Sequence, residues 1–234
     1  MRQEIEQIER QFSAEGHRRQ AKSKPAIANP LPLGLLSFAT GIFLVAILDL
    51  NARSITTPNI VVGMLIFFGG VCQFIAGLIE FINGNTASNP LTNFAASLFS
   101  SFAAFNFSYA MIFLPGSGIM AAYTDAETGE LRSEFHQALA MYLLAWFIVS
   151  VIFTIGAMRS SWVLFTDLVF LDLCFLFLAC GNMVGNNALL KAGYSMGLVV
   201  AFLTYYAGCA ALWAADTTPI HLPTFAMYTR SEDA

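Results

Sequence analysis

The sequence predicts an all-α integral membrane protein with six transmembrane helices in each protomer. Six long apolar runs, separated by short polar gaps, occupy most of the chain between Leu31 and Ala215. Apolar residues make up 57% of the chain and charged residues only 11%, whereas soluble domains carry about 25% charged residues. A helix needs about 20 apolar residues to cross a hydrocarbon core of roughly 30 Å. The runs are continuous rather than alternating, which favours helices over the strands of a barrel.

The apolar runs set the expected spans and leave a polar tail at each end. We expect an N-terminal tail over residues 1–28, a transmembrane transport domain over residues 29–215 and a C-terminal tail over residues 216–234. The expected spans are Leu31–Leu50, Ile60–Ile82, Phe94–Leu114, Gln137–Ala157, Trp162–Cys180 and Tyr194–Ala215.

The first three spans each carry a local signal. Asn29-Pro30 precedes the first span, and proline suits a helix start because it fixes φ and lacks an N–H. In the second span, Gly63, Gly70 and Gly77 recur every seven residues, which predicts a stripe that packs closely against another helix. The third span follows another Asn-Pro pair. Two such pairs in six spans are reminiscent of an aquaporin, but Asn29 precedes the first span, so that interpretation is rejected.

The last three spans are separated by contrasting connections. The segment Pro115–Phe135 before the fourth span is the longest loop and the most acidic. The fifth span leads into the polar run Gly181–Asn187, whose glycines permit a broken helix that lines a cavity. Helix N-termini at such a break attract anions. The alternative is a polar loop outside the membrane.

The distribution of Lys and Arg predicts the orientation. With both termini inside, cytoplasmic segments hold eight of these cations and outer loops hold three, Arg53, Arg132 and Lys191. Because cytoplasmic loops carry the excess of positive charge, we expect cytoplasmic N- and C-termini in the plasma membrane.

Carboxyl groups inside the spans are candidates for function. A charge at a helix centre costs roughly 2.5–3.5 kcal/mol on insertion scales. Asp167 and Asp172 lie well inside the fifth span, and Asp172 is nearest its middle. Asp172 is either a neutral carboxyl bonded to a neighbouring helix or a protonatable group beside a substrate path. Glu80 lies near the end of the second span. No Lys or Arg lies at mid-depth, so a salt bridge within the membrane is not expected.

The sequence offers little for enzyme or metal chemistry. The three histidines, His17, His136 and His221, all lie outside the middle of the spans, and the four cysteines lack the spacing of a metal site. We therefore expect no enzymatic activity, no metal or other cofactor and no nucleic-acid partner.

The run NPLPLGL at Asn29–Leu35 resembles the signature of the acetate transporter family, also called the succinate–acetate permeases. The resemblance continues, in the same order and spacing, through Phe68-Gly69-Gly70, Gln73, Ala76–Glu80, Gly84-Asn85-Thr86, Met141-Tyr142, Trp146, Gly156–Arg159, Gly181-Asn182 and Gly185-Asn186. It covers nearly all of residues 29–215 and implies a six-helix protomer that assembles into a homo-hexamer in the lipid bilayer.

The resemblance also implies a function and a path. It implies proton-linked movement of acetate and related small carboxylates, such as succinate, through each protomer. A hydrophobic constriction is expected at Phe38, Leu171 and a span-three aromatic residue, which is Phe99 or, alternatively, Phe94. The expected path residues are Asn29, Pro30, Gln73, Asn182 and Asn186, and the expected proton-coupling residues are Asp172 and Glu80.

Two other functions stay open at this point. The first is a passive carboxylate channel of the same fold, which the sequence does not distinguish from a symporter. The second is a membrane sensor that reports carboxylate levels through the N-terminal tail.

Overall fold

The computed structural model describes residues 28–87, 90–213 and 218–227 of the chain. Nearly all of the expected N-terminal tail therefore lies outside the described residues, as do the first and last parts of the C-terminal tail. Within the described ranges, six helices are long and apolar enough to cross a membrane, which confirms the predicted fold class.

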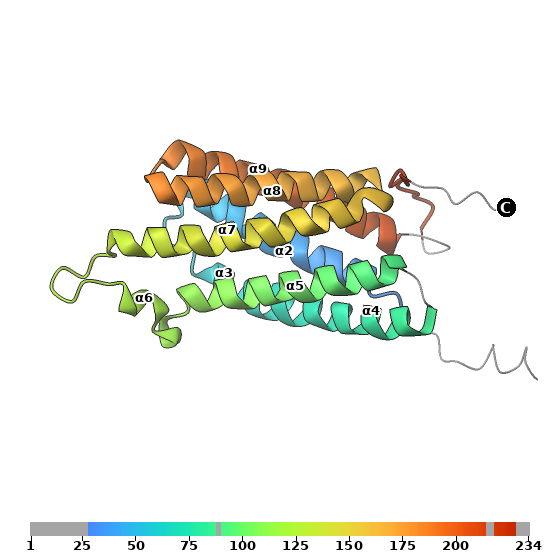
Figure 1. Cartoon of the computed structure of the whole chain (residues 1–234), viewed down its shortest axis with the longest axis horizontal. Helices are drawn as coiled ribbons and strands as arrows, with labels where there is room; N and C mark the ends of the chain where they lie inside the picture. The colour runs from blue at the N-terminus through green and yellow to red at the C-terminus, as the bar shows by residue number, and fades with distance from the viewer. Residues whose placement is uncertain (1–27, 88–89, 214–217, 228–234) are drawn as a thin grey trace, which may run out of the picture.

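The helices run side by side along the length of the molecule (Figure 1). Their bounds are α2 Leu31–Asp49, α3 Ile60–Met64, the π-helix η2 Leu65–Cys72, α4 Gln73–Ala87, α5 Pro90–Phe113, α6 Ile119–Ala122, α7 Ser133–Gly156, α8 Trp162–Val184 and α9 Asn187–Leu212; the 3₁₀ turns are η1 Ala52–Ser54, η3 Pro115–Ser117 and η4 Ala157–Arg159. The α3, η2 and α4 segments join into one span.

The six spans form a ring. Helix α2 packs along α9, α9 along α8 and α8 along α7, while η2 and α4 pack against both α2 and α5. Helices α5 and α7 approach each other least closely in this ring. Aromatic rings bridge that seam: the ring centroids of Phe105 and Trp146 lie 5.1 Å apart and those of Phe102 and Phe153 lie 5.9 Å apart.

Close contact of η2 and α4 with α5 depends on glycines, though not on the whole stripe that the sequence predicted. A Cβ atom at Gly70 would lie 2.5 Å from the Phe107 ring, and one at Gly77 would lie 3.0 Å from the backbone nitrogen of Ser100. Gly63, in contrast, faces open space. The π-helix η2 begins after Gly63 and contains Gly70, and each residue inserted into an α-helix turns the rest of the helix by about 100°. The predicted inclusion of Gly63 in the stripe is therefore wrong.

The connection between α8 and α9 is a tight turn rather than a long break. Helix α8 continues to Val184, Gly185 adopts φ +63°, and the Asn186 side chain caps α9 by accepting hydrogen bonds from the backbone N–H groups of Ala188 and Leu189. Helix α9 begins at Asn187, so the expected start of the sixth span at Tyr194 was wrong, while α8 ends four residues after the expected end of the fifth span at Cys180.

The glycines in this region allow α8 and α9 to pack closely and do not break a helix. A Cβ atom at Gly181 would lie 2.8 Å from the Leu190 side chain, and one at Gly193 would lie 2.7 Å from Leu178. Both glycines therefore allow α8 and α9 to approach each other closely near the turn that joins them.

Residues 218–227 fold back across one end of the ring. The backbone N–H of Trp162 donates to the Phe225 carbonyl at 2.9 Å, and that of Met227 donates to the Ser160 carbonyl at 3.1 Å. The Tyr206 hydroxyl donates to the Pro223 carbonyl at 2.8 Å. This described part of the C-terminal segment is thus fastened to the junction between α7 and α8.

We predict that Gly77→Val lowers the thermal unfolding temperature of the purified protein by several degrees. The added side chain would enter the space of the Ser100 backbone, and overpacking of this kind costs about 1–3 kcal/mol. Gly63→Val is the matched control, because a side chain there meets open space. Equal unfolding temperatures for the two variants would contradict the proposed glycine contact.

Candidate transport pathway

A row of cavities runs through the centre of the ring. Each cavity shares lining residues with the next, so their order along the molecule is defined. We call them the mouth cavity, the central cavity, the tyrosine cavity and the outer cavity. Phe99 lines both the mouth and central cavities, Phe38 and Leu171 line both the central and tyrosine cavities, and Tyr109 lines both the tyrosine and outer cavities.

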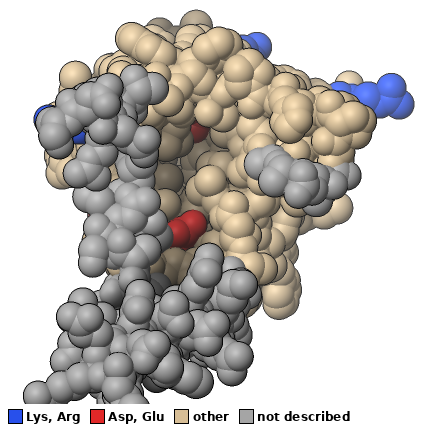
Figure 2. Space-filling model, turned by 90° about the vertical axis from the view of Figure 1, so that its right-hand side faces the viewer, with Lys and Arg blue, Asp and Glu red and all other residues tan. Residues whose placement is uncertain are grey.

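The mouth cavity is the largest of the four. It offers about 490 Å³ of space for the centres of water molecules and lies between Leu31, Phe94, Ser160 and Thr224. Figure 2 shows this end of the molecule, which is hollowed at its centre and has acidic side chains within the hollow. Since Thr224 belongs to the segment that folds back, the described C-terminal residues form part of the wall of the mouth.

The central cavity is nearly closed. It offers only about 10 Å³ by the same measure, which is about the least that holds one water molecule. Phe38, Phe99 and Leu171 all line it, and each side chain is at most 8% exposed. The structure therefore brings together the three residues that the sequence resemblance placed at a constriction. Phe94, the alternative to Phe99, lines only the mouth cavity.

The NPLPLGL run shapes the site of Phe99. A Cβ atom at Gly34 would lie 2.6 Å from the Phe99 ring, so only glycine leaves room for this ring against α2. Phe38, one helical turn further along, packs with its ring centroid 5.3 Å from that of Phe102. The local sequence of α2 thus holds aromatic side chains of α5 beside the central cavity.

Gln73 brings a polar group to the central cavity from the first turn of α4. It is almost fully buried, and its Oε1 accepts a hydrogen bond of 3.0 Å from Nδ2 of Asn106. The same nitrogen donates to the Gly69 carbonyl, within η2, at 2.9 Å. A π-helix offsets its carbonyls from the α-helical pattern, and Asn106 joins one of them to Gln73. The predicted path residue Gln73 therefore lies on a cavity wall in a fixed position.

Asp167 and Thr204 are a second polar pair in the central cavity. Both side chains line it and are buried. The Thr204 hydroxyl donates to Oδ1 of Asp167 at 2.9 Å, and its oxygen also lies 2.9 Å from the Val200 carbonyl oxygen. A carboxyl group thus lies beside Phe99 and Leu171, at the narrowest part of the row of cavities.

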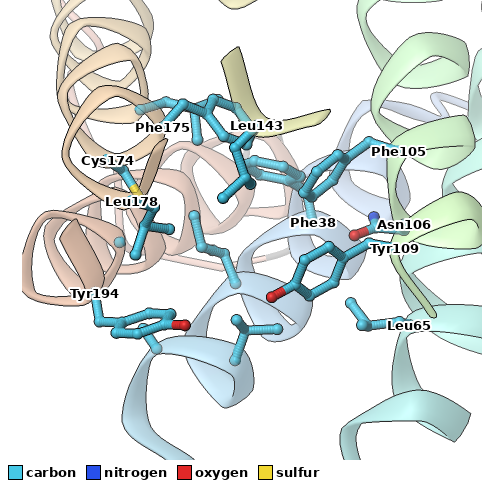
Figure 3. Close-up of a pocket in the computed structure, with 15 residues that line it drawn as sticks. Phe38, Leu65, Phe105, Asn106, Tyr109, Leu143, Cys174, Phe175, Leu178 and Tyr194 are labelled. Atoms are coloured by element: carbon cyan, nitrogen blue, oxygen red, sulfur yellow. The ribbon is translucent and has the colours of Figure 1, made fainter. Parts of the chain in front are cut away.

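The tyrosine cavity is lined by aromatic and aliphatic side chains with a few polar atoms. It offers about 50 Å³ of space for water centres. Figure 3 shows the hydroxyls of Tyr109 and Tyr194 pointing into it from α5 and α9, with Asn106 nearby. Beyond Tyr109, the outer cavity reaches Asp49 at the end of α2 and Pro58 before α3.

The two expected proton-coupling residues lie away from this row of cavities. Asp172 lies at the contact of α8 with α7, where its Oδ2 accepts a hydrogen bond of 2.8 Å from Thr154. Its Oδ1 is buried without a partner among the described residues. Glu80 is buried on α4, two turns from Gln73. Neither residue lines one of the four cavities.

The asparagines and Pro30 occupy different surroundings. Asn29 is exposed, and its side chain accepts a hydrogen bond of 3.0 Å from the Leu31 backbone, which stabilises the start of α2. Pro30 is buried at the same helix start. Asn186 caps α9 and is exposed. None of the three lines a described cavity, so the structure separates them from Gln73.

Asn182 lines a separate polar pocket between α7, α8 and α9. Its Nδ2 donates to the Leu178 carbonyl at 2.8 Å, and its Oδ1 lies 3.2 Å from Nδ1 of His136. The pocket opens at the end of the molecule opposite the mouth cavity, because α8 ends there and α7 begins there (Figure 1).

Sequence reasoning missed several cavity residues. Asn106, Tyr109, Tyr194 and Thr204 were not singled out, because one polar residue in an apolar run does not reveal which way it faces. Position along the chain predicts a functional role for Asp172 rather than for Asp167, because Asp172 lies closer to the middle of the span. The sequence shows only that both carboxyl groups lie inside the span. Which of them faces a cavity depends on the neighbours of each carboxyl in the folded protein.

Comparison with known proteins supplies the evolutionary setting. The chain is 34% identical over 200 residues to ammonia transport outward protein 2 of Saccharomyces cerevisiae, a match covering 86% of this chain and 67% of the relative. It is 34% identical over 191 residues to acetate permease A of Emericella nidulans, covering 79% of this chain and 61% of the relative. The chain thus spans about three fifths to two thirds of the length of these fungal relatives.

A bacterial protein matches over most of its own length. The chain is 31% identical over 183 residues to the succinate-acetate/proton symporter SatP of Escherichia coli, covering 77% of this chain and 86% of SatP. A solved structure of the bacterial acetate channel SatP matches with a TM-score of 0.66 and 26% identity, covering 80% of this chain and 93% of that one.

These proteins are named as a permease, a transport protein, a symporter and a channel. The names agree with the prediction that the chain is not an enzyme. The GPR1/FUN34/yaaH family model matches residues 12–229, which is nearly the whole chain. The sequence resemblance to acetate transporters is therefore confirmed, and the protein belongs to the GPR1/FUN34/yaaH family.

Proposed function

We propose that this protein carries acetate and related small carboxylates, including succinate, across a membrane together with protons. The row of cavities in the protomer is the proposed route. The observation that carries the proposal is the closed, apolar central cavity, which Phe38, Phe99 and Leu171 line together with buried polar groups. The names of the acetate permease and of SatP support the choice of substrate.

The constriction explains how such a route would select its solute. A carboxylate must lose water to pass Phe38, Phe99 and Leu171, and narrow apolar segments close by excluding water. The edges of aromatic rings are partly positive and tolerate a carboxylate. The amide of Gln73 and the hydroxyl of Thr204 lie where lost hydration needs replacement. Because the central cavity holds about one water, the structure is a closed state and passage requires the lining side chains to move.

Membrane location and assembly are further parts of the proposal. We propose a plasma-membrane protein with cytoplasmic termini, supported by the excess of Lys and Arg in the segments on that side. Protease access to the termini in sealed cells tests this orientation.

We also propose a homo-hexamer, supported by the sequence resemblance and by exposed apolar side chains such as Phe67, Ile152 and Phe202. The mass of the detergent-purified particle tests the assembly.

We expect proteoliposomes to take up radiolabelled acetate faster than protein-free vesicles, and an inward proton gradient to increase the initial rate. Protein-free vesicles are essential because acetic acid itself diffuses through lipid. Succinate provides a less permeant second substrate. Ammonium serves as the comparison solute, because one relative is named for ammonia transport.

Each outcome of this assay favours one function. Gradient-driven accumulation of succinate supports the symporter. Flux that only equilibrates favours the passive channel, and ammonium flux without carboxylate flux contradicts the proposed substrate. If no solute moves, the sensor becomes the better hypothesis. Deletion of residues 1–28 is an independent test, since a transporter keeps its flux without this tail and a sensor loses its output.

We predict that Phe99→Ala increases the uptake of longer monocarboxylates relative to acetate several-fold, because it removes a ring from the narrowest part of the route. Phe94→Ala is the matched control, since Phe94 lines only the wide mouth cavity. Initial uptake rates of acetate and butyrate measure the change in selectivity. A larger change in Phe94→Ala than in Phe99→Ala would assign the third constriction position to Phe94.

A further inference from the structure

The central cavity contains a single ionisable side chain among the described residues, that of Asp167. The carboxyl group is 3% exposed and lies in the same small space as Phe99, Phe38 and Leu171. Phe99 separates this space from the mouth cavity, and Phe38 and Leu171 border the tyrosine cavity. A solute that follows the proposed route therefore passes Asp167 between the two sides of the constriction.

Thr204 is able to serve both protonation states of Asp167. A threonine hydroxyl has one proton to donate and lone pairs to accept, yet its oxygen lies 2.9 Å from both the Asp167 carboxyl and the Val200 carbonyl. When Asp167 is charged, the hydroxyl donates to the carboxylate. When Asp167 is protonated, the carboxyl donates to the hydroxyl oxygen, and the hydroxyl proton turns to the Val200 carbonyl. Neither state leaves the carboxyl oxygen that faces Thr204 without a partner.

Other charged groups are separated from Asp167 by the packing of the ring. The remaining residues that line the central cavity, from α2, α4, α5, α8 and α9, are neutral. On α8 itself, Asp172 is bonded to Thr154 of α7. Glu80 lies two turns beyond Gln73 on α4, and Arg159 lies at the end of η4. No described cation therefore neutralises Asp167 inside its cavity.

The charge of Asp167 opposes the passage of an anion. Like charges repel strongly at close range where little water screens them, and the small central cavity forces a solute close to the carboxyl. One proton on Asp167 removes this repulsion and provides an O–H that donates to the substrate carboxylate.

We propose that the Asp167 carboxyl, paired with the Thr204 hydroxyl, holds the proton that accompanies each carboxylate through the constriction. Asp167 takes the proton from water on the side of higher proton concentration. Its O–H, which donates to Thr204 while the cavity holds no substrate, turns to donate to the substrate carboxylate instead. The proton then returns to water on the other side as the O–H bond breaks and Asp167 becomes charged again. This inference rests on the proposed carboxylate transport and assigns its proton coupling to a residue.

The test measures whether acetate moves as an anion alone or together with a proton. Proteoliposomes are prepared with the wild-type protein, Asp167→Asn, Asp172→Asn, Thr204→Val and Thr204→Ser. A potassium gradient with valinomycin sets an inside-positive potential large enough to concentrate a monovalent anion about tenfold. Initial acetate uptake is then compared with and without this potential, and with and without an inward proton gradient.

We expect wild-type acetate uptake to respond to the proton gradient and not to the potential. Asp167→Asn removes the fixed negative charge and the exchangeable proton, so its uptake responds to the potential and loses its response to the proton gradient. Thr204→Val lowers proton-driven uptake several-fold, whereas Thr204→Ser retains it because serine keeps the hydroxyl. Asp172→Asn behaves as the wild type. Proton-driven uptake by Asp167→Asn equal to that of the wild type would overturn the proposal.

A spectroscopic readout separates this inference from the proposed function. Infrared difference spectra of the wild-type protein, recorded across a pH titration, should contain a protonated carboxyl band that is absent from Asp167→Asn. A missing band in a wild type that transports acetate overturns the role of Asp167 alone. An absence of acetate and succinate flux in the wild type overturns the carboxylate function, whatever the band shows. Size-exclusion profiles and unfolding temperatures establish that each variant is folded.

Discussion

The absence of hydrogen-bond partners in lipid is the constraint on which the rest of the structure depends. It requires backbone groups to be satisfied within helices, and it requires polar side chains inside the spans to find partners in the protein. Hydrogen bonds pair Gln73 with Asn106, Asp167 with Thr204 and Asp172 with Thr154. Each pair joins two helices of the ring. The same pairs therefore hold the helices together and set where polar chemistry is available within the membrane.

Two of these pairs, Gln73–Asn106 and Asp167–Thr204, face the interior of the ring, and the position of the first depends on local backbone features. The π-helix η2 changes the face that α4 presents, so that Gln73 lies on the cavity while Gly70 and Gly77 lie against α5. The close approach at these glycines brings α5 near enough for Asn106 to bond both Gln73 and the Gly69 carbonyl. An irregular turn and two missing side chains thus position one amide on the proposed route.

The constriction and the proposed proton-binding carboxyl lie in the same closed central cavity. Phe38, Phe99 and Leu171 leave space for about one water, so a carboxylate there would be almost fully desolvated. A charged Asp167 in the same space would make that state more costly, and a protonated one would relieve it. In the proposed mechanism, the side chains that exclude water and the carboxyl that binds a proton act on the same step.

The sequence alone determined the number and type of spans, because apolar length and composition decide whether a segment enters lipid. It also determined the family, through NPLPLGL and the later motifs, and from that resemblance it placed Phe38, Phe99 and Leu171 near one another. Sequence could not determine where α8 ends and α9 begins, because glycines that break a helix and glycines that allow close packing look the same in one chain. Gly181 and Gly193 are of the second kind.

Only the tertiary structure decided which polar residues face the cavities. Asp167 and Asp172 are five residues apart on one helix, about 500° of rotation, so they point to faces roughly 140° apart. Which face meets the interior depends on how α8 is rotated against α7 and α9, and that rotation follows from side-chain packing between helices distant in sequence. Depth in the membrane can be read from position along the chain, but direction around a helix depends on its neighbours.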